Sequence, residues 1–505
     1  MAQPHGAQNP FKDPSIKNEK GIGPTSTNAP MSMPSANSTL VSVPLEKKIE
    51  PSALENQTSI WAGYEQDVLP PKENARWLRN LRHQIMYLYR RLFGIVFVTN
   101  LGIFIAVAAN FENTNSSYIG KVVIGNLFGA ILMRQDYVID AFFVVCTSVP
   151  RSWPLWIRRI LARVYHIGGL HSGAGASGTL WLLLFSIKAS IEVARGEGGA
   201  SGATLVVTFV ILALLFLLLI FAHPTLRKKF HDSFEATHRF LGWSATALVW
   251  IQIILLTNDY RGDTPLRTAL LHSAPFWLII VATISLALPW IRLKKVPVRC
   301  EKLSNHAVRM YFDYGTLPSI YTPGAGSFVR LSDAPLTEWH SFATMPEPGK
   351  TGFSLVVSRA GDWTIKMISK PPSHIWKRGI PTYGVMKIAP MFRRLVVVAT
   401  GSGIGPCTAA IMEKKIPIRV LWTAPNVRET FGDKLVDSIL EANPESVIYN
   451  TRQHGKPDMV KLTYRLVTEF KAEAVVIISN QTLTEKVVYG MMSRGIPAFG
   501  AIWDS

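Results

Sequence analysis

The chain has 505 residues, of which 48% are hydrophobic, and a formal net charge of +19 at pH 7. This length is enough for two to four domains. Its three cysteines, Cys146, Cys300 and Cys407, form no CxxC pair, which argues against a disulfide framework and against a cysteine-rich metal site. Much of the positive charge lies beside apolar stretches, so we interpret it as a membrane-topology signal and expect no nucleic-acid partner.

The first 75 residues are rich in Pro, Ser, Asn and Gly and poor in aromatic residues. Such a composition cannot bury enough apolar surface to offset the entropy of the chain, so we predict a disordered tail over residues 1–75. No basic segment followed by an apolar segment opens the chain, and a cleaved signal peptide is therefore not expected.

Residues 76–295 contain six apolar stretches that are long enough to cross or nearly cross a bilayer. The stretches are 92–109, 122–146, 174–191, 205–222, 240–257 and 274–291. Basic residues gather in the connections on one side, so the positive-inside rule places both termini in the cytosol. We predict a six-helix transmembrane domain in a multi-pass protein, in the plasma membrane rather than an internal membrane; an N-x-S sequon at Asn115 falls on the outer side.

Three charged residues, Arg134, Asp136 and Asp140, interrupt the second apolar stretch. Charges inside a membrane are costly unless they pair with one another or face a cavity. They either form a buried ion pair that fixes helix packing or belong to a proton path or substrate contact.

Two histidines precede apolar stretches that are predicted to run in the same direction, His171 before the third and His238 before the fifth. Neutral imidazoles at matching depth on neighbouring helices can bind one haem iron. Here the chain resembles the transmembrane domain of ferric reductases and NADPH oxidases, which carry a second histidine 13 or 14 residues further along each helix. Phe185 and Gln252 occupy the positions fourteen residues on, so the resemblance implies at most one haem. Histidines facing headgroups are the alternative.

Residues 296–385 show short alternating segments with Gly and Pro turns, which predict an antiparallel β-barrel. Within them "WHSFATM" (339–345) resembles the HPFT segment of ferredoxin-reductase-like flavoproteins, with a hydroxyl lost or moved to Thr344. "GDWTIKM" (361–367), predicted to be a strand, resembles their GDWT segment. The resemblance implies that FAD is bound by His340, Ser341, Phe342, Ala343, Gly361, Asp362, Trp363 and Thr364. A barrel without a ligand is the alternative.

Residues 386–505 repeat the order strand, glycine turn, helix, which predicts an α/β domain with a parallel sheet. One turn presents backbone N–H groups and a helix N-terminus that suit a pyrophosphate. Its candidate residues are Gly401, Gly403, Ile404, Gly405 and Pro406. The GxGxxP form of the turn is similar to that of ferredoxin-reductase-like enzymes, which implies a site for a nicotinamide nucleotide.

Three further segments gain roles from the same resemblance. "TRQHGKPD" lies where the family recognises the 2′-phosphate of NADPH, so Thr451, Arg452 and Lys456 favour NADPH over NADH, with a solvated basic loop as the alternative. Ser479 stands where the family has the cysteine of a CGP motif beside the nicotinamide. Trp503 matches an aromatic residue that stacks on the flavin, although it could serve packing alone.

Over residues 80–505 the chain resembles most the fungal TmpA-type integral membrane flavoproteins, within the ferric reductase/NADPH oxidase-like superfamily, and the C-terminal region of related adenylating enzymes. The segments "NLFGAILMRQDYVID" and "RGIPAFGAIWDS" carry this resemblance. It implies a membrane-bound oxidoreductase that passes electrons from NADPH to FAD and on to an unidentified acceptor at the cytosolic face or inner leaflet, with a role in developmental signalling. A haem-containing transmembrane ferric reductase or oxidase and a degenerate flavoprotein acting as a redox-sensing scaffold are the alternatives.

Overall fold

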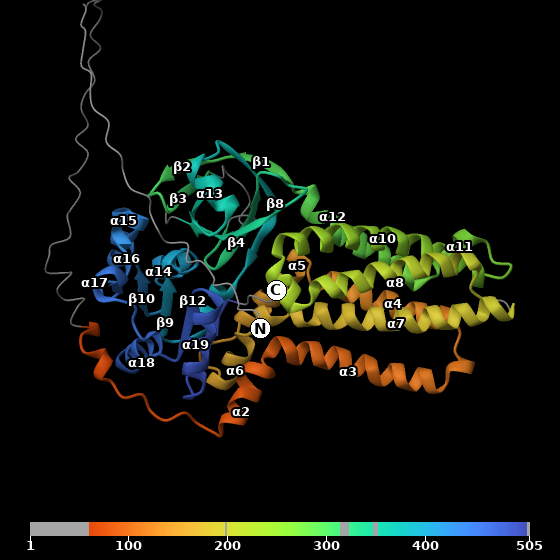
Figure 1. Cartoon of the computed structure of the whole chain (residues 1–505), viewed down its shortest axis with the longest axis horizontal. Coiled ribbons are helices and arrows are strands. Elements are labelled where there is room, and N and C mark those ends of the chain that lie inside the picture. Colours follow the sequence, from red (N-terminus) through yellow and green to blue (C-terminus); the bar gives the residue numbers. More distant parts are fainter. Residues whose placement is uncertain (1–59, 197–198, 314–322, 347–351, 502–505) are drawn as a thin grey trace, which may run out of the picture. The chain divides into compact units, whose positions relative to one another are not determined.

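The computed structural model describes residues 60–196, 199–313, 323–346 and 352–501. The helical part contains six long helices that pack into a bundle (Figure 1): α7 lies against α3, α4 and α8, α10 against α8 and α12, and α12 against α4. They are α3 (Leu88–Ala109), α4 (Ser116–Leu132), α7 (Gly168–Arg195), α8 (Gly202–Ala222), α10 (His231–Tyr260) and α12 (Ala274–Ile291). Trp181, Phe185 and Ile211 are fully buried in its core.

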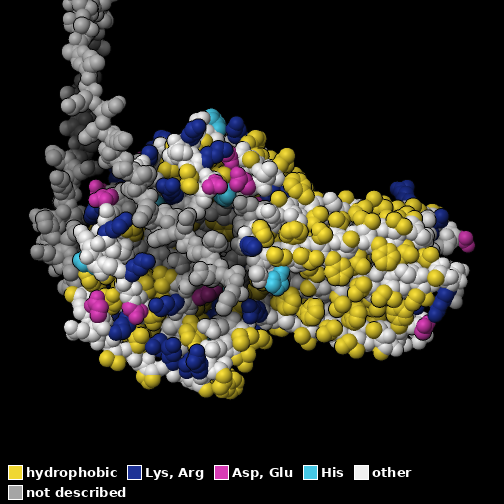
Figure 2. Space-filling model, in the orientation of Figure 1, with side chains coloured by type: hydrophobic (Ala, Val, Ile, Leu, Met, Phe, Trp, Pro, Cys, Tyr) yellow, Lys and Arg dark blue, Asp and Glu magenta, His cyan; other side chains and the backbone are white. Residues whose placement is uncertain are grey.

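Large apolar side chains cover the outer surface of the bundle (Figure 2). Within the described residues, five helices are long and apolar enough to cross a membrane, and a bent pair of helices supplies a sixth candidate. These are α3, α7, α8, α10 and α12, followed by the pair α4 and α5 (Asp136–Thr147). This pattern is typical of helices that face lipid on one side and one another on the other.

The second apolar stretch, predicted over 122–146, is not one continuous helix. The chain bends by 70° between α4 and α5, and α5 then packs against strand β8 of the first antiparallel sheet. Asp136 accepts a hydrogen bond of 2.9 Å from Arg330 of β4, and Asp140 accepts one of 2.9 Å from the backbone N–H of Tyr383. Two of the three charged residues therefore bind the β region, which favours the packing interpretation over a proton path.

Short helices connect and flank these elements. They are α2 (Arg76–Asn80), α6 (Leu155–Leu161), α9 (Pro224–Lys229) and α11 (Leu266–Leu271), together with η1 (Tyr64–Gln66), η2 (Leu81–Ile85), η3 (Phe111–Asn113), η4 (Val164–His166) and η6 (Val385–Met391). Arg158 of α6 makes a two-pronged ion pair with Glu473, at 2.8 and 3.0 Å, and also donates to the Met391 carbonyl. This buried guanidinium attaches α6 to the C-terminal domain.

The middle of the chain forms two antiparallel sheets of four strands, with orders β1-β8-β4-β5 and β2-β3-β7-β6. The strands are β1 (Lys294–Pro297), β2 (Arg299–Lys302), β3 (Ala307–Phe312), β4 (Ser327–Ser332), β5 (His340–Ala343), β6 (Met345–Pro346), β7 (Phe353–Ser358) and β8 (His374–Tyr383). Their inward residues, among them Val308, Met310 and Leu355, share one core. The antiparallel β prediction is confirmed by this pairing.

One segment in this region differs from its prediction. Residues Asp362–Ser369 form helix α13, so the predicted strand over "WTIKMI" is wrong. Its buried residues are Trp363, Met367 and Ile368. They are four residues and then one residue apart, and a helix places residues at these positions on one side. The helix begins at the GDWT segment itself.

The C-terminal part is a five-stranded parallel sheet with the order β11-β10-β9-β12-β13, which confirms the predicted α/β arrangement. The strands are β9 (Leu395–Thr400), β10 (Ile418–Ala424), β11 (Val447–Asn450), β12 (Ala474–Ile478) and β13 (Ala498–Gly500). The helices are α14 (Ile404–Glu413), α15 (Val427–Phe431), α16 (Asp433–Ala442), α17 (Thr451–His454), α18 (Met459–Phe470) and α19 (Gln481–Met492). β9 is buried on both faces, as its continuous apolar run requires.

The predicted tail over residues 1–75 extends too far, because the described residues from 60 onward pack against the C-terminal domain. Trp61 meets the rings of Tyr449 and His454 edge-on, with ring centroids 4.8 Å away in each case. Tyr64 is 3% exposed, and its hydroxyl accepts a hydrogen bond from the Asp458 backbone. Residues 1–59 lie outside the described part of the chain.

Candidate active site

The predicted glycine turn begins where strand β9 ends. It consists of the 3-10 turn η7 (Gly401–Gly403) and the first residues of α14. Gly401 has a φ of +52°, which favours glycine, and a Cβ at Gly403 would lie 2.2 Å from the Ile478 carbonyl oxygen. A Cβ at Gly401 or at Gly405 would meet no atom within 4 Å. The backbone of the turn is thus tightly packed against the sheet at Gly403, and it is open to a ligand at Gly401 and Gly405.

This turn lies at the point where the strand order of the parallel sheet reverses. Chain order runs from β9 to β10 and β11 on one side, and returns to β12 and β13 on the other. Ligands of such sheets bind at the carboxyl ends of the strands beside this switch point. Ser479 directly follows β12, and its hydroxyl lies 2.6 Å from the Thr400 hydroxyl at the end of β9. The structure therefore brings Ser479, a predicted site residue, next to the glycine turn.

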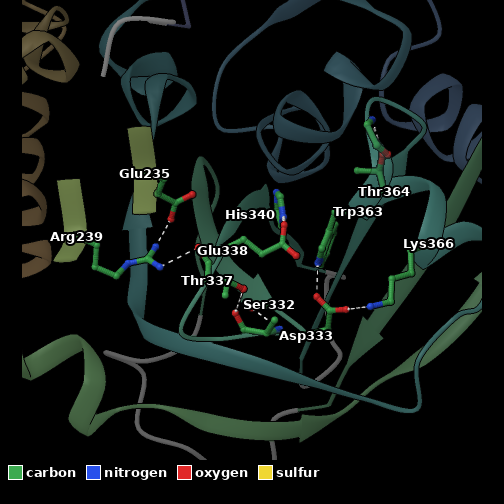
Figure 3. Close-up of polar contacts among 12 residues, drawn as sticks. Glu235, Arg239, Ser332, Asp333, Thr337, Glu338, His340, Trp363, Thr364 and Lys366 are labelled. Atoms are coloured by element: carbon green, nitrogen blue, oxygen red, sulfur yellow. Dashed lines mark hydrogen bonds and ion pairs between the residues drawn. The ribbon is translucent and has the colours of Figure 1, made fainter. Parts of the chain in front are cut away.

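The two predicted flavin segments also come together (Figure 3). β5 carries His340 and Phe342, and the ring of Trp363 from α13 lies 4.3 Å from the His340 ring and 5.6 Å from the Phe342 ring, between centroids. Ser341 is exposed, and Ala343 is half-buried. The segments "WHSFATM" and "GDWTIKM" are thus neighbours in space.

Asp333 holds this cluster in place from below. It accepts a hydrogen bond of 2.7 Å from the Trp363 indole and a second one from Lys366 (Figure 3). Burial raises the pKa of the Asp333 carboxyl, but these two donors outweigh burial and lower it overall. Asp333 is therefore an ionised acceptor that orients Trp363. Sequence reasoning missed it, because the chain around it carries no motif.

Two hydroxyl groups that the sequence analysis considered for flavin contacts make hydrogen bonds within the protein. Thr364 donates to the Gly361 carbonyl at 2.8 Å and accepts from the backbone of Ala360 and Gly361, so its hydroxyl caps its own helix. Thr344 is buried, with its hydroxyl 2.8 Å from that of Ser327. What remains open for a ligand is the helix N-terminus, since a Cβ at Gly361 would meet nothing within 4 Å.

The glycine turn packs against the antiparallel sheet that carries β6 and β7 and against the flavin segment on β5. Helix α14 packs against β5 and β6, and η7 packs against β7. Open glycine backbone at the start of one helix thus adjoins the strand that carries His340 and Phe342. The N-terminus of α13 and the N-terminus of α14 both suit phosphate groups, so the residues present fit a flavin dinucleotide and a nicotinamide dinucleotide.

The predicted 2′-phosphate residues lie at the same edge of the parallel sheet. Thr451 and Arg452 are in α17, directly after β11, and Lys456 follows in the loop; both basic side chains are exposed. Asn450 fixes this loop by accepting hydrogen bonds from the backbones of Arg452 and Asn426, each 3.0 Å long. Trp61 packs against His454 of this loop and is a second residue that sequence reasoning missed.

The histidine pair is brought together as predicted. The rings of His171 and His238 lie with centroids 6.0 Å apart, and Nδ1 of His171 donates to the Ala130 carbonyl at 2.8 Å. This bond leaves Nε2 of His171 as the nitrogen available to a metal. Phe234 also packs against the His238 ring, at 5.3 Å between centroids. Two such ligands could hold at most one haem, and Phe185 and Gln252 occupy the positions fourteen residues further along the two helices.

A stacked cation joins the bundle to the barrel and was also missed. The Arg378 guanidinium lies 4.9 Å from the ring of Trp290 in α12 and 4.5 Å from that of Trp339, the residue before His340. Burial, followed by the charges of Arg330 and Arg239, lowers the pKa of Arg378 to about 10. Trp503 lies outside the described residues, so its predicted role has no structural counterpart.

Known proteins resemble this chain over most of its length. The family model for the C-terminal domain of adenylate-forming reductase 03009 matches residues 385–505. Adenylate-forming reductase 03009 of Coprinopsis cinerea is 63% identical over 455 residues, which are 90% of this chain and 44% of that protein. Adenylate-forming reductase 06235 of the same fungus is 60% identical over 456 residues, with the same coverage. The chain thus spans less than half the length of these curated relatives.

Solved structures resemble a smaller part. A ferredoxin NADP+ reductase from Neisseria gonorrhoeae with bound FAD and NADP is 13% identical, covers 41% of this chain and 98% of its own, and has a TM-score of 0.34. Phthalate dioxygenase reductase is 15% identical, covers 41% of this chain and 67% of its own, and has a TM-score of 0.33. At these scores the fold assignment rests on the strand pairing of this chain.

Proposed function

We propose that this chain is a membrane-embedded, FAD-dependent oxidoreductase that takes electrons from NADPH and passes them to an acceptor at the cytosolic face or inner leaflet. One observation carries the proposal. The open glycine turn at the sheet's switch point adjoins, through α14, the strand that bears the His340 segment. Each dinucleotide would then have its own helix N-terminus for its phosphates, that of α13 for FAD and that of α14 for NADPH, and the two rings would meet between them.

On the nucleotide side, the backbone N–H groups of Gly401, Gly403 and Gly405 would bind the pyrophosphate of NADPH. Arg452 and Lys456 at the same sheet edge would bind its 2′-phosphate, which NADH lacks. Ser479, held by Thr400, would orient the nicotinamide at the end of β12. Each of these groups positions the nucleotide, and none needs to gain or lose a proton.

On the flavin side, the open N-terminus of α13 would bind the pyrophosphate of FAD, and the β5 edge with His340, Ser341, Phe342 and Ala343 would border the ring. When bound, FAD supplies the two-electron chemistry of accepting hydride and releasing electrons to a further acceptor. Trp363, fixed by Asp333, keeps the His340 and Phe342 rings in register and helps to exclude water.

A membrane location is supported by the apolar surface of the bundle and by its candidate spans. With basic residues concentrated near the β domains, both domains would lie on the cytosolic side. The longer relatives are named adenylate-forming reductases, and we propose that this chain corresponds to their C-terminal part and shares its redox chemistry. No step is assigned to the adenylate-forming part of those proteins.

The proposal is tested on the full chain purified in detergent. Bound flavin is released and quantified, and the flavin absorbance is followed after NADPH is added without oxygen. We expect one FAD per chain and bleaching that is faster with NADPH than with NADH. The proposal would be refuted by protein that shows a cooperative thermal unfolding transition, and is therefore folded, yet contains no flavin even after incubation with FAD.

Two observations favour a second candidate, a redox-sensing flavoprotein with little turnover. The hydroxyls of Thr364 and Ser479 are already engaged within the protein, at 2.8 and 2.6 Å from their partners. Bound flavin that NADPH does not bleach would select this candidate. The same spectrum examines the His171–His238 pair, because a haem would add an intense Soret band, with at most one haem per chain.

A further inference from the structure

A cavity of about 370 Å³ lies between α4, α7, α10 and α12, at the end of the bundle that α11 covers. It is distant in the fold from the flavin and nucleotide segments, since its walls come from the ends of these helices that lie away from the sheets. Its size falls in the range of small-molecule sites. The proposed redox function leaves this cavity without a role.

The floor of the cavity is apolar except for one buried amide. Leu182 and Phe185 are fully buried there, and Gln252 is 7% exposed. The Gln252 amide nitrogen donates to the Thr208 hydroxyl at 2.9 Å. Its carbonyl oxygen has no hydrogen-bond partner among the described residues and is not enclosed by protein atoms, so it faces the open space. A buried acceptor of this kind favours a ligand that donates a hydrogen bond.

The mouth of the cavity is basic. Lys121, Arg261 and His272 line it, and none of its lining residues is acidic. Lys121 is exposed and makes no ion pair or hydrogen bond with the part of the chain that the structure describes. The Glu192 carboxylate, which contacts the lining residue Tyr260, already accepts hydrogen bonds from Ser116, Ala200 and Tyr260. The mouth therefore presents positive charge with no carboxylate among its lining residues.

We propose that this cavity binds a small aromatic carboxylate with a hydrogen-bond donor at its far end. The carboxylate would lie at Lys121 and Arg261, the ring against Ile253 and Leu256, and the donor at the Gln252 carbonyl. Nine residues of helix, a rise of about 13 Å, separate the backbones of Gln252 and Arg261, so the two side chains would extend toward the ring from opposite ends. A lipid acyl chain could enter the same space, but it would leave the Gln252 oxygen without a donor.

The proposal is tested by calorimetric titration of the full chain in nanodiscs with three matched probes. 4-Hydroxyphenylacetate carries both groups, phenylacetate lacks the donor, and 4-hydroxyphenylethanol lacks the carboxylate. We expect 4-hydroxyphenylacetate to bind at least about tenfold more tightly than either partial probe. This factor is the affinity that a probe loses when one buried hydrogen bond, charge-assisted or neutral, is missing. Equal affinities for all three probes, or no binding of the first, would overturn the proposal.

Variants assign the contacts. Lys121→Met should weaken 4-hydroxyphenylacetate about tenfold and leave 4-hydroxyphenylethanol unchanged, whereas Gln252→Met should weaken it and leave phenylacetate unchanged. Ala269→Phe, which fills the cavity from α11, should abolish binding, and Lys486→Gln on α19 serves as the matched charge control. Flavin content and thermal stability show whether each variant folds.

A lipid is the rival occupant, and mass spectrometry of the purified chain distinguishes it. Stoichiometric lipid that 4-hydroxyphenylacetate does not displace, and that Ala269→Phe removes, would overturn the assignment to an aromatic carboxylate. Unaltered affinity in Ala269→Phe would place the binding elsewhere and would overturn the site itself. Because the cavity shares no residue with the flavin segments, neither result bears on the redox proposal.

Discussion

Replacing Gly405 by alanine separates the effect of the glycine turn on nucleotide binding from its effect on folding. Gly405 has ordinary helical backbone, and a Cβ there meets no atom within 4 Å, so the folded protein should accept the methyl group. Alanine is also the better helix former, which should leave stability unchanged or raise it by up to about 1 kcal/mol. The methyl group would nevertheless occupy the space into which a pyrophosphate must come to reach the backbone.

The other two glycines provide the contrast. In Gly403→Ala the new Cβ would lie 2.2 Å from the Ile478 carbonyl oxygen, so the turn must move by nearly 1 Å, at a cost of about 1–3 kcal/mol for overpacking. In Gly401→Ala the residue must keep a φ of +52°, which costs about 1–2 kcal/mol without a clash. Both variants should lose stability, whereas Gly405→Ala should not.

The assay combines thermal denaturation with steady-state kinetics in NADPH. Loss of one charge-assisted hydrogen bond to phosphate removes about 1.5–3 kcal/mol, so Gly405→Ala should raise the KM for NADPH at least about tenfold. Its melting temperature and flavin content should match those of the unaltered chain. A KM within twofold of the unaltered value would show that no nucleotide approaches this backbone, and the reasoning from the open glycines would fail.

Three further predictions concern charge and packing. Arg452→Ala and Lys456→Ala should each lower kcat/KM for NADPH about tenfold and leave NADH unchanged, if they bind the 2′-phosphate. Arg158→Met should lower the free energy of unfolding by about 3 kcal/mol, because the Glu473 carboxylate loses its buried partner. Burial raises the pKa of Glu473, but hydrogen bonds from Arg158 lower it overall. This stabilisation should therefore be full at neutral pH and fade as the pH falls below the carboxyl's ordinary range. The free energies of unfolding of the unaltered chain and of Arg158→Met should accordingly converge at acid pH. Trp61→Ala should release the loop after β11 and raise the KM for NADPH several-fold with kcat unchanged, whereas an equal change with NADH would assign Trp61 a merely structural role.

The wrong prediction for residues 363–368 has a local cause. Alternating polar and apolar residues in "WTIKMI" satisfy a strand pattern, and six residues are too few to exclude a helix. Trp363 and Met367 are both buried at helical spacing, and the Asp333 carboxylate that holds the Trp363 indole comes from thirty residues earlier in the chain. The motif was therefore found by its residue types, but its conformation depended on a partner outside it.

The predictions for the second apolar stretch and for the N-terminal tail failed for the same reason, because both segments contact residues that are distant in the sequence. Asp136 pairs with Arg330, almost two hundred residues later, and Trp61 packs against Tyr449, nearly four hundred residues later. A window along the sequence contains neither partner, so the charges looked membrane-embedded and the tail looked unable to fold. The glycine turn needed no such partner, because its pattern and its place after a buried strand are local.

Local chemistry in the sequence alone determined the apolar helices, the alternating β segments, the parallel α/β repeats and the residue types of the nucleotide turn. Only the tertiary structure decided that α4 and α5 break at a 70° bend, that His340 and Trp363 share one cluster, and that Gln252 faces a cavity with a basic mouth. The physical reason is that periodicity and turn preference are properties of neighbouring residues. Burial, ion pairing and open space depend on which distant segments the folded chain brings together.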